Sequence, residues 1–171
     1  KIENKFQIKI IYKPILLGAI HKMVGIKAAI FIPLKAKFMI KDCKLWADKN
    51  KIDFKFNNYF PINSINLMRG VIVAEKDNFE RLYIDKFYDA VWKDGLNLND
   101  DAVIVRILKN LNLNPKIFLS ENDNPEIKAE LKKRTDDAYN KGIFGVPSFI
   151  INKKMFWGQD RLEFVLQEAL K

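Results

Sequence analysis

Gly142-Ile143-Phe144-Gly145-Val146-Pro147-Ser148-Phe149-Ile150-Ile151-Asn152 has the clearest pattern in this chain of 171 residues. Close behind it comes Met155-Phe156-Trp157-Gly158-Gln159-Asp160-Arg161-Leu162. Apolar runs on either side of Asn152-Lys153 predict two short strands joined by a two-residue turn. The glycine break at Gly158 predicts a terminal helix from about Gln159 to Leu170. The end of the chain therefore predicts a ββα unit.

Pro147 lies near the start of the first of these strands. Proline has no backbone N–H, so within a sheet it is expected at a strand start, a bulge or an edge. Val146-Pro147 is also a candidate cis peptide bond, and in that form the Val146 N–H and C=O would face outward, free to pair with an extended peptide. A strand-initiating proline in a plain hairpin explains the same residues, and this stretch alone leaves both alternatives open.

The composition predicts a globular protein with one well-packed domain, or a domain with a large insertion. Apolar residues make up 49% of the chain, and no apolar run reaches the ~20 residues that a membrane-spanning helix needs. The net charge is +9, with lysines in nearly every segment and only five arginines. We expect no nucleic-acid partner, because that needs a clustered basic face, and only a modest attraction for small anions.

Cys43 is the only cysteine. A single sulfur allows neither an internal disulfide nor a Cys-x-x-Cys pair, so a dithiol oxidoreductase is excluded. An unpaired cysteine fits a reducing compartment, and we expect a cytoplasmic location. No cluster of residues has metal-ligand spacing, and the only histidine, His21, is expected to pack or to face solvent.

Upstream of the ββα unit, the pattern predicts one strand followed by helices. Phe6 to Tyr12 is rich in apolar and β-branched side chains and predicts a strand. Helical spacing, caps and prolines predict helices over about residues 16–24, 33–50, 64–75, 78–92, 102–111, 115–120 and 126–141. Asn63 is a natural N-cap for the helix that follows it. The predicted class is α/β, a small α/β unit interrupted by an all-helical insertion.

Two further stretches join the C-terminal one in resembling a single family. They are Tyr12-Lys13-Pro14-Ile15-Leu16-Leu17-Gly18-Ala19 and Ile32-Pro33-Leu34-Lys35-Ala36-Lys37-Phe38-Met39. In this order the three are similar to the 2-hydroxychromene-2-carboxylate isomerase family, a DsbA-like branch of the thioredoxin superfamily that includes kappa-class glutathione transferases. The resemblance implies a thioredoxin-like part of residues 1–15 and 125–171 that holds glutathione. Residues 16–124 would be a helical insertion covering the second substrate.

The resemblance also implies which residues bind glutathione. The backbone of Val146, exposed by a cis Pro147, would pair antiparallel with the cysteinyl part. Asp160 would meet the γ-glutamyl ammonium, and the helix start at Gln159 would receive its carboxylate. Lys35, in the family's V-P-x-K context, would pair with the glycyl carboxylate.

The second substrate implied by the resemblance is a small aromatic carboxylate. Phe144 and Trp157, with Asn63, would line its pocket. A homodimer is a further possibility that the sequence leaves open.

Two departures from the family pattern limit these expectations. The chain begins Lys-Ile-Glu-Asn-Lys, without an initiator Met, and looks like a fragment or a trimmed product. The family's first strand and first helix, with the serine that stabilises the glutathione thiolate, would precede Lys1, so no catalytic residue is expected within the chain. A frequent family asparagine falls at Ile26, which cannot make the same hydrogen bond.

The leading hypothesis is a glutathione-dependent isomerase that acts on a 2-hydroxychromene-2-carboxylate-like acid through the glutathione thiolate. A kappa-type glutathione transferase would use the same thiolate and release a conjugate. A non-catalytic thioredoxin-fold protein that binds glutathione or a peptide is the third alternative.

Overall fold

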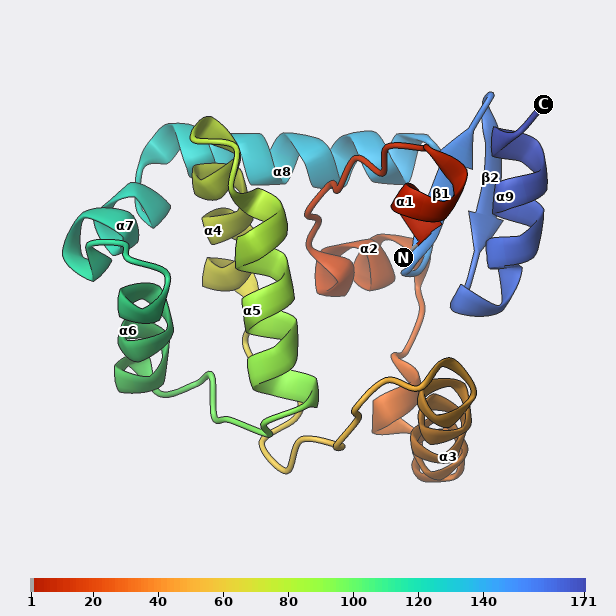
Figure 1. Ribbon diagram of the computed structural model, residues 1–171, viewed down its shortest axis with the longest axis horizontal. Helices are drawn as coiled ribbons and strands as arrows, with labels where there is room; N and C mark the ends of the chain where they lie inside the picture. The colour runs from red at the N-terminus through yellow and green to blue at the C-terminus, as the bar shows by residue number, and fades with distance from the viewer. Residues whose placement is uncertain (1) are drawn as a thin grey trace.

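The predicted ββα unit is present at the C-terminus. The computed structural model describes residues 2–171 and has strands β1 (Ser148–Ile151) and β2 (Lys154–Trp157), the 3-10 helix η2 (Gln159–Arg161) and helix α9 (Leu162–Ala169) (Figure 1). The strands are antiparallel, with Ser148 opposite Trp157 and Ile151 opposite Lys154. Asn152 and Lys153 have φ angles of 49° and 66°. A tight turn between twisted strands needs positive φ at both central residues, so the predicted turn is confirmed.

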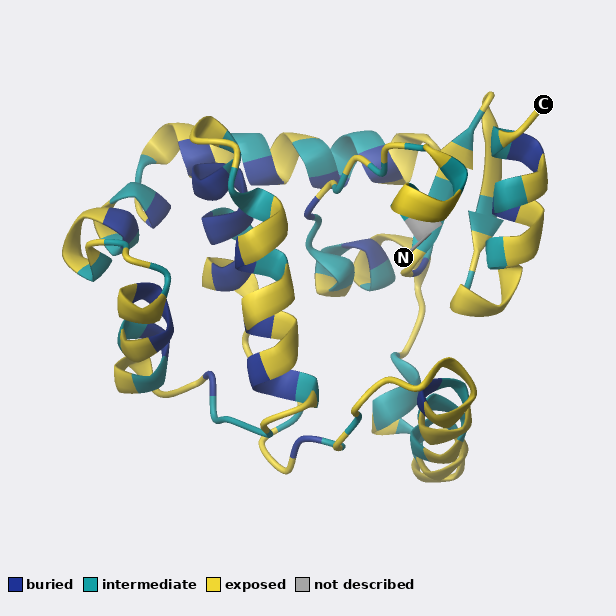
Figure 2. Cartoon of the chain, viewed as in Figure 1, coloured by how far each residue is buried: buried dark blue, intermediate teal, exposed yellow. Residues whose placement is uncertain are grey.

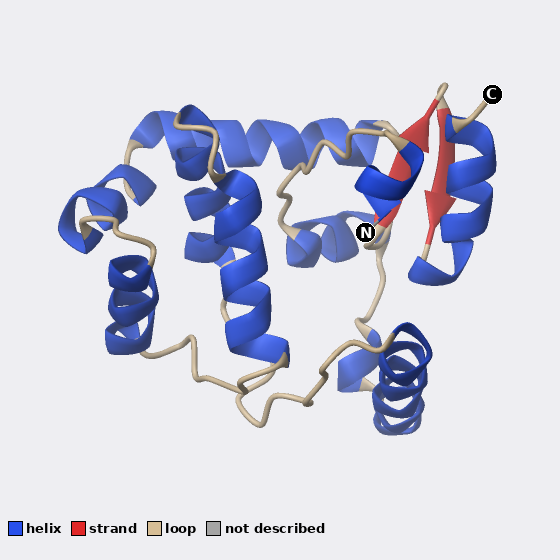
Figure 3. Cartoon of the chain, viewed as in Figure 1, coloured by secondary structure: helices blue, strands red, loops and turns tan. Residues whose placement is uncertain are grey.

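The other described elements are helical (Figure 3). They are α1 (Ile2–Phe6), α2 (Leu17–Val24), η1 (Ala29–Phe31), α3 (Pro33–Asn50), α4 (Ile65–Lys76), α5 (Glu80–Trp92), α6 (Asp101–Asn110), α7 (Pro115–Asn122) and α8 (Pro125–Asn140).

Polar caps explain where several of these helices begin. The side chains of Asp100, Asn114 and Asn124 each accept a backbone N–H from the first turn of α6, α7 and α8. Proline follows at the first helical position of α7 and α8, where its missing N–H leaves no helix bond unmade. At α4 the expected cap differs by one position, because Ser64 precedes the helix. Asn63 still accepts the Ile65 N–H at 3.2 Å.

The largest hydrophobic core lies among helices α4 to α8 (Figure 2). Helices α4 and α5 approach closely at Gly70, where a Cβ atom would overlap the phenol of Tyr83 and lie 3.2 Å from the Phe118 ring. Tyr83 is buried, and its hydroxyl donates to the carbonyl of Leu67 at 3.3 Å. Glycine at this position therefore sets the distance between the two helices.

Helix α8 connects the helical core to the hairpin. It packs against α4 and α7 at one end and α2 at the other, and Figure 1 shows it running from the core to β1. Arg134 on α8 binds both carboxylate oxygens of Glu75 on α4, at 2.8 and 2.7 Å. Thr135 accepts the Leu16 N–H at 3.0 Å and so holds the start of α2. The core that α8 shares with α4 extends across the boundary predicted between residues 124 and 125. That division into two parts stays a prediction.

Helix α3 lies apart from this core (Figure 1). Of its residues only Ala47 is buried, and Phe38 and Leu45 are 71% and 67% exposed. Much of the apolar surface of this helix is therefore open to solvent. None of the helices within residues 2–171 is long and apolar enough to cross a membrane.

The strand predicted over Phe6 to Tyr12 is wrong. Residues 2–6 form α1, and residues 7–16 have no regular structure. The N–H of Ile8 bonds to the Glu3 carbonyl at 3.2 Å, and the N–H of Ile10 bonds to the Glu3 carboxylate at 3.0 Å. A strand needs a neighbouring strand to complete its hydrogen bonds, and none pairs with this segment within residues 2–171.

We expect Gly70→Ala to lower the free energy of unfolding by about 1–2 kcal/mol, because overpacking a core costs about 1–3 kcal/mol and alanine returns at most about 1 kcal/mol of helix propensity. Gly18→Ala in α2 is the matched control, since a Cβ there meets no atom within 4 Å. The control should be neutral or stabilising in urea unfolding. Equal effects of both substitutions would contradict the close approach at Gly70.

Candidate functional site

The predicted binding residues Val146 and Pro147 lie immediately before β1, and the peptide bond between them is cis, as expected. The Pro147 carbonyl accepts the N–H of Gly158 at 2.9 Å. This bond continues the hairpin ladder one step beyond the Ser148–Trp157 pair. It brings the end of β2 beside the proline.

Val146 is open to solvent and carries free backbone groups. Its exposed fraction is 48%. Within residues 2–171, neither its N–H nor its C=O has a hydrogen-bond partner. Backbone N–H and C=O groups are strong donors and acceptors, so this residue can pair with an extended chain from outside.

Gln159 and Asp160 follow Gly158 directly and form η2. Gly158 has φ 104°, a conformation that favours glycine, and a Cβ at this position would collide with the Asp160 carboxylate. The chain thus turns sharply at Gly158, and the Asp160 carboxylate lies close to this turn. Its nearest cation is Arg161, whose Nε lies 3.4 Å from the Asp160 Oδ2.

Two predicted pocket residues, Phe144 and Trp157, pack against each other. Their ring centroids are 4.9 Å apart, with the rings edge to face. Gly145, which follows Phe144, is buried. A Cβ at this position would lie 2.6 Å from the Trp157 Nε1. The two rings therefore form an aromatic wall beside the Val146–Pro147 bend.

Lys35 and Asn63 belong to other parts of the structure. Lys35 is exposed in the first turn of α3, which contains no acidic residue. Asn63 lies before α4, and its N–H donates to the Asn99 side chain at 3.2 Å. Among the interactions of residues 2–171, none joins either residue to the hairpin.

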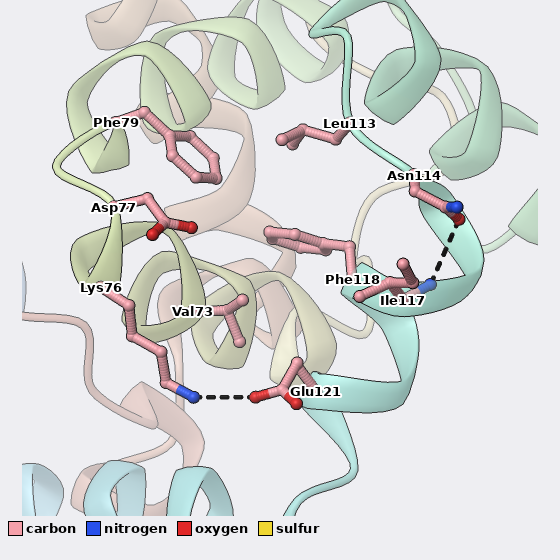
Figure 4. A pocket seen from close by; sticks show the side chains of 9 residues that line it. All are labelled: Val73, Lys76, Asp77, Phe79, Leu113, Asn114, Ile117, Phe118 and Glu121. Carbon is pink, nitrogen blue, oxygen red and sulfur yellow. Dashed lines mark hydrogen bonds and ion pairs between the residues drawn. The ribbon is translucent and has the colours of Figure 1, made fainter.

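A cavity of about 290 Å³ lies between α4, the start of α5 and α7, away from every predicted site residue (Figure 4). Phe79 and Phe118 face it from opposite sides, and the Asp77 carboxylate points between them. The Lys76 ammonium is paired with Glu121 at 2.8 Å on its border. The side chains around this cavity carry one more negative than positive charge, which does not suit an anion.

Cys43 offers no activated thiol. Burial raises the pKa of this thiol, and the neighbouring Asp42 raises it further. A thiol with a raised pKa is a poor nucleophile at neutral pH. Within residues 2–171 there is also no group of three or more His, Cys, Asp or Glu that could hold a metal ion.

A family model described as "DSBA-like thioredoxin domain" matches residues 1–171. The chain belongs to the DSBA-like thioredoxin domain family. A solved 2-hydroxychromene-2-carboxylate isomerase has the same fold, with a TM-score of 0.89 at 22% identity over 99% of this chain and 83% of that one. The DsbA-type thioredoxin-like fold predicted from the sequence is therefore confirmed.

Relatives of this DSBA-like chain include enzymes of two kinds. A 2-hydroxychromene-2-carboxylate isomerase from Sphingobium xenophagum is 24% identical over 77% of this chain. That match covers 66% of the relative's length. Human glutathione S-transferase kappa 1 is 23% identical over 96% of this chain and 79% of its own length. The predicted relationship to both groups is confirmed.

Arg161 is a charged group at this DSBA-like site that the sequence reasoning missed. Its side chain is about half exposed and also lies over the Phe164 ring, 6.0 Å from the centroid. The sequence could have indicated Arg161, because it follows Asp160 directly and the two place an acid and a base at a helix start. With both charges present, the site can meet an ammonium and a carboxylate of one ligand.

The hairpin that carries the site is held to α9 by Glu168. Its carboxylate contacts Lys154 at 2.9 Å on β2, Lys171 at 2.8 Å and Asn152 at 3.4 Å in the turn. The Lys154 ammonium, with Lys171 and Asn152, lowers the pKa of Glu168 to about 2.

This pKa predicts how the stability depends on pH. Because the folded pKa lies below the ordinary value of 4.5, the stabilisation by Glu168 is complete above pH 4.5 and is lost as the pH falls towards 2. We expect Glu168→Gln to be less stable than wild type at pH 7, with a difference that shrinks between pH 5 and about pH 2. Urea unfolding across this range measures it. Glu163→Gln on the exposed face of α9 is the control, and a Glu168→Gln difference that is constant with pH would contradict the ion cluster.

Proposed function

We propose that this chain binds glutathione at the Val146–Pro147 bend and belongs to an enzyme that isomerises an aromatic carboxylate. The observation that carries the proposal is the exposed Val146 backbone, whose N–H and C=O have no partner within residues 2–171. Two such groups on one residue can add a peptide as an extra antiparallel strand. Glutathione is a short peptide that carries a thiol.

The charges beside the bend fit the γ-glutamyl end of glutathione. Asp160 would bind the ammonium, and the N–H groups at the start of η2 would receive the carboxylate. Arg161 adds a second cation for the carboxylate. Lys35 would pair with the glycyl carboxylate, because this lysine is exposed and has no ion-pair partner among the described residues.

Once bound, glutathione would supply a thiol nucleophile that this chain lacks, since burial raises the pKa of the Cys43 thiol. The residues of the chain would fix its position. Pairing with Val146 holds the cysteinyl part in place beside the aromatic wall of Phe144 and Trp157. Those rings, with Asn63, would line the site of the aromatic acid, and an apolar wall excludes water from the reacting atoms.

An isomerase is favoured over a transferase by the names of the relatives. The S. xenophagum protein and the solved structural neighbour are both 2-hydroxychromene-2-carboxylate isomerases. Glutathione held by Val146 would supply a thiol nucleophile that is regenerated in the isomerisation and is therefore not consumed. The kappa-type alternative, favoured by the human relative, would keep the new carbon–sulfur bond.

Calorimetric titration tests the binding site. We expect glutathione to bind the wild-type chain and Asp160→Asn to weaken binding about tenfold, because a charge-assisted hydrogen bond contributes about 1.5 kcal/mol. Asp94→Asn, an exposed aspartate after α5, is the matched control. Glutathione acetylated on its γ-glutamyl nitrogen should bind both Asp160 forms equally. Equal binding of free glutathione to Asp160→Asn and Asp94→Asn would overturn the assignment.

Product analysis tests the reaction. When glutathione and 2-hydroxychromene-2-carboxylate are incubated with the protein, we expect the isomerised acid to accumulate while the free thiol concentration stays constant. Chromatography and thiol titration measure the two quantities. A stable thioether with matching loss of thiol would favour the transferase, and glutathione binding without either product would favour a binding protein.

A further inference from the structure

The cavity of about 290 Å³ between α4, the start of α5 and α7 is separate from the proposed glutathione site (Figure 4). We call it the α4–α7 cavity. Figure 1 shows α7 at one end of the molecule and the hairpin at the other. The volume is at the lower end of the range for small-ligand sites. Five apolar side chains line it, those of Val73, Phe79, Leu113, Ile117 and Phe118. The α4–α7 cavity can therefore take a small molecule that is largely apolar.

One charge in this lining is uncompensated. Lys76 and Glu121 neutralise each other, because the Lys76 Nζ and the Glu121 Oε2 are 2.8 Å apart. The Asp77 carboxylate points into the cavity, as Figure 4 shows. Within residues 2–171 it takes part in no ion pair and accepts no hydrogen bond. The charge that a ligand would bring to balance this lining is therefore positive.

The two helix ends at the cavity favour the same sign of charge. Helix α4 ends at Lys76, and the C-terminal end of a helix carries a partial negative charge. The first turn of α7 could offer N–H groups to an anion. However, Asn114 already accepts the N–H groups of Lys116 and Ile117 through its Oδ1, at 3.0 and 3.3 Å, and that of Phe118 through its carbonyl, at 3.0 Å. An anion therefore finds no free donor in this turn.

The aromatic part of the lining also suits a cation. The ring centroids of Phe79 and Phe118 are 6.3 Å apart, and the Phe118 ring is stacked on the Tyr83 ring at 5.5 Å. The face of an aromatic ring attracts an ammonium group within about 6 Å of its centroid. Aromatic rings also pack favourably against the ring of a ligand. A molecule with an aromatic ring and an ammonium group therefore matches both the rings and the Asp77 carboxylate.

We propose that the α4–α7 cavity binds a primary arylalkylammonium ion. Its aromatic ring lies against Phe79 and Phe118, and its apolar chain is covered by Leu113 and Ile117. The ammonium group donates hydrogen bonds to the Asp77 carboxylate. A primary ammonium is required because an ionised carboxylate only accepts hydrogen bonds and a quaternary ammonium has none to donate. The site uses neither glutathione nor the aromatic acid, so it does not depend on the proposed function.

Three probes that share a phenyl ring and differ in charge test the site. They are 2-phenylethylammonium, 2-phenylethanol and 3-phenylpropionate, and calorimetry and ligand-observed NMR measure their binding. We expect wild type to bind the ammonium about fivefold more tightly than the alcohol, and the propionate more weakly than either. Asp77→Asn should weaken the ammonium alone, by about fivefold, which is the upper end of the effect of an exposed ion pair.

The matched control is Asp94→Asn, because Asp94 is also exposed and also lies just after a helix, α5. This variant should bind all three probes like wild type. The proposal would be overturned by an equal loss of ammonium binding in Asp77→Asn and Asp94→Asn. It would also be overturned if wild type bound the propionate as tightly as the ammonium, or bound none of the probes.

Removing one ring gives a second readout. Phe79→Leu keeps an apolar side chain and removes the face that attracts the ammonium. We expect the ammonium to be weakened about two- to fivefold more than the alcohol, because only the ammonium loses a cation–π contact. Circular dichroism confirms that the variant is folded. An unchanged ratio of the two affinities would contradict the placing of the ammonium beside the Phe79 ring.

Asp160 at the hairpin is the alternative place for the ammonium, since the proposed function gives it an ammonium of glutathione. The Arg161 Nε lies 3.4 Å from the Asp160 Oδ2, whereas Asp77 has no such cation within residues 2–171. Asp160→Asn should therefore bind 2-phenylethylammonium like wild type. A loss of binding in Asp160→Asn together with full binding in Asp77→Asn would place the ammonium at the hairpin and overturn the proposal.

Discussion

The hairpin ladder ends because proline has no N–H to donate. Its last hydrogen bond runs from the Gly158 N–H to the Pro147 carbonyl at 2.9 Å. One residue earlier, Val146 has both backbone groups, and within residues 2–171 neither is bonded. Free N–H and C=O groups at a sheet edge are a template for another strand. In the proposed function, a peptide-like ligand would pair with these two backbone groups.

The rest of the C-terminal half fixes this edge in space. Helix α8 ends at Asn140, Gly142 follows with φ 81°, and the Ile143 N–H returns to the Ala138 carbonyl at 3.0 Å. Such a C-cap stops the helix and sets the direction of the chain that leaves it. Within the second half of α8, Arg134 attaches this helix to α4 through its pair with Glu75. The bend is therefore connected through a rigid helix to the largest core of the protein.

How much the sequence revealed follows from the range of the interactions involved. The Asn152-Lys153 turn and the caps at Asn114 and Asn124 were predictable, because each depends on bonds to residues next in sequence. The Phe6 to Tyr12 strand was wrong because its hydrogen bonds would need a distant partner strand. Its apolar residues gave the correct composition for a strand without the neighbour that makes one.

The candidate site shows the same division. Val146, Pro147, Gln159 and Asp160 come together because a two-residue hairpin turn brings them there, and the local pattern predicted that turn. The family resemblance was needed to name them as binding residues. The close approach at Gly70 depends on how α4 packs against Tyr83 of α5 and Phe118 of α7, and no periodic pattern reports that distance. His21 gave no signal for a binding site, because a single histidine predicts packing or exposure equally well.

The positions of the charged side chains matter more for anion binding than the net charge of +9. On α8 each of Lys132, Lys133 and Arg134 pairs with an acid one helical turn away, so these cations cancel locally. The acid-free residues 4–41 have no such neighbours in sequence, and Lys22, Lys27 and Lys35 all come from them. Interactions between exposed charges are largely screened beyond about 8 Å at physiological ionic strength. A small anion near residues 4–41 would therefore meet lysines that no acid of the same segment neutralises, whatever the net charge of the whole chain.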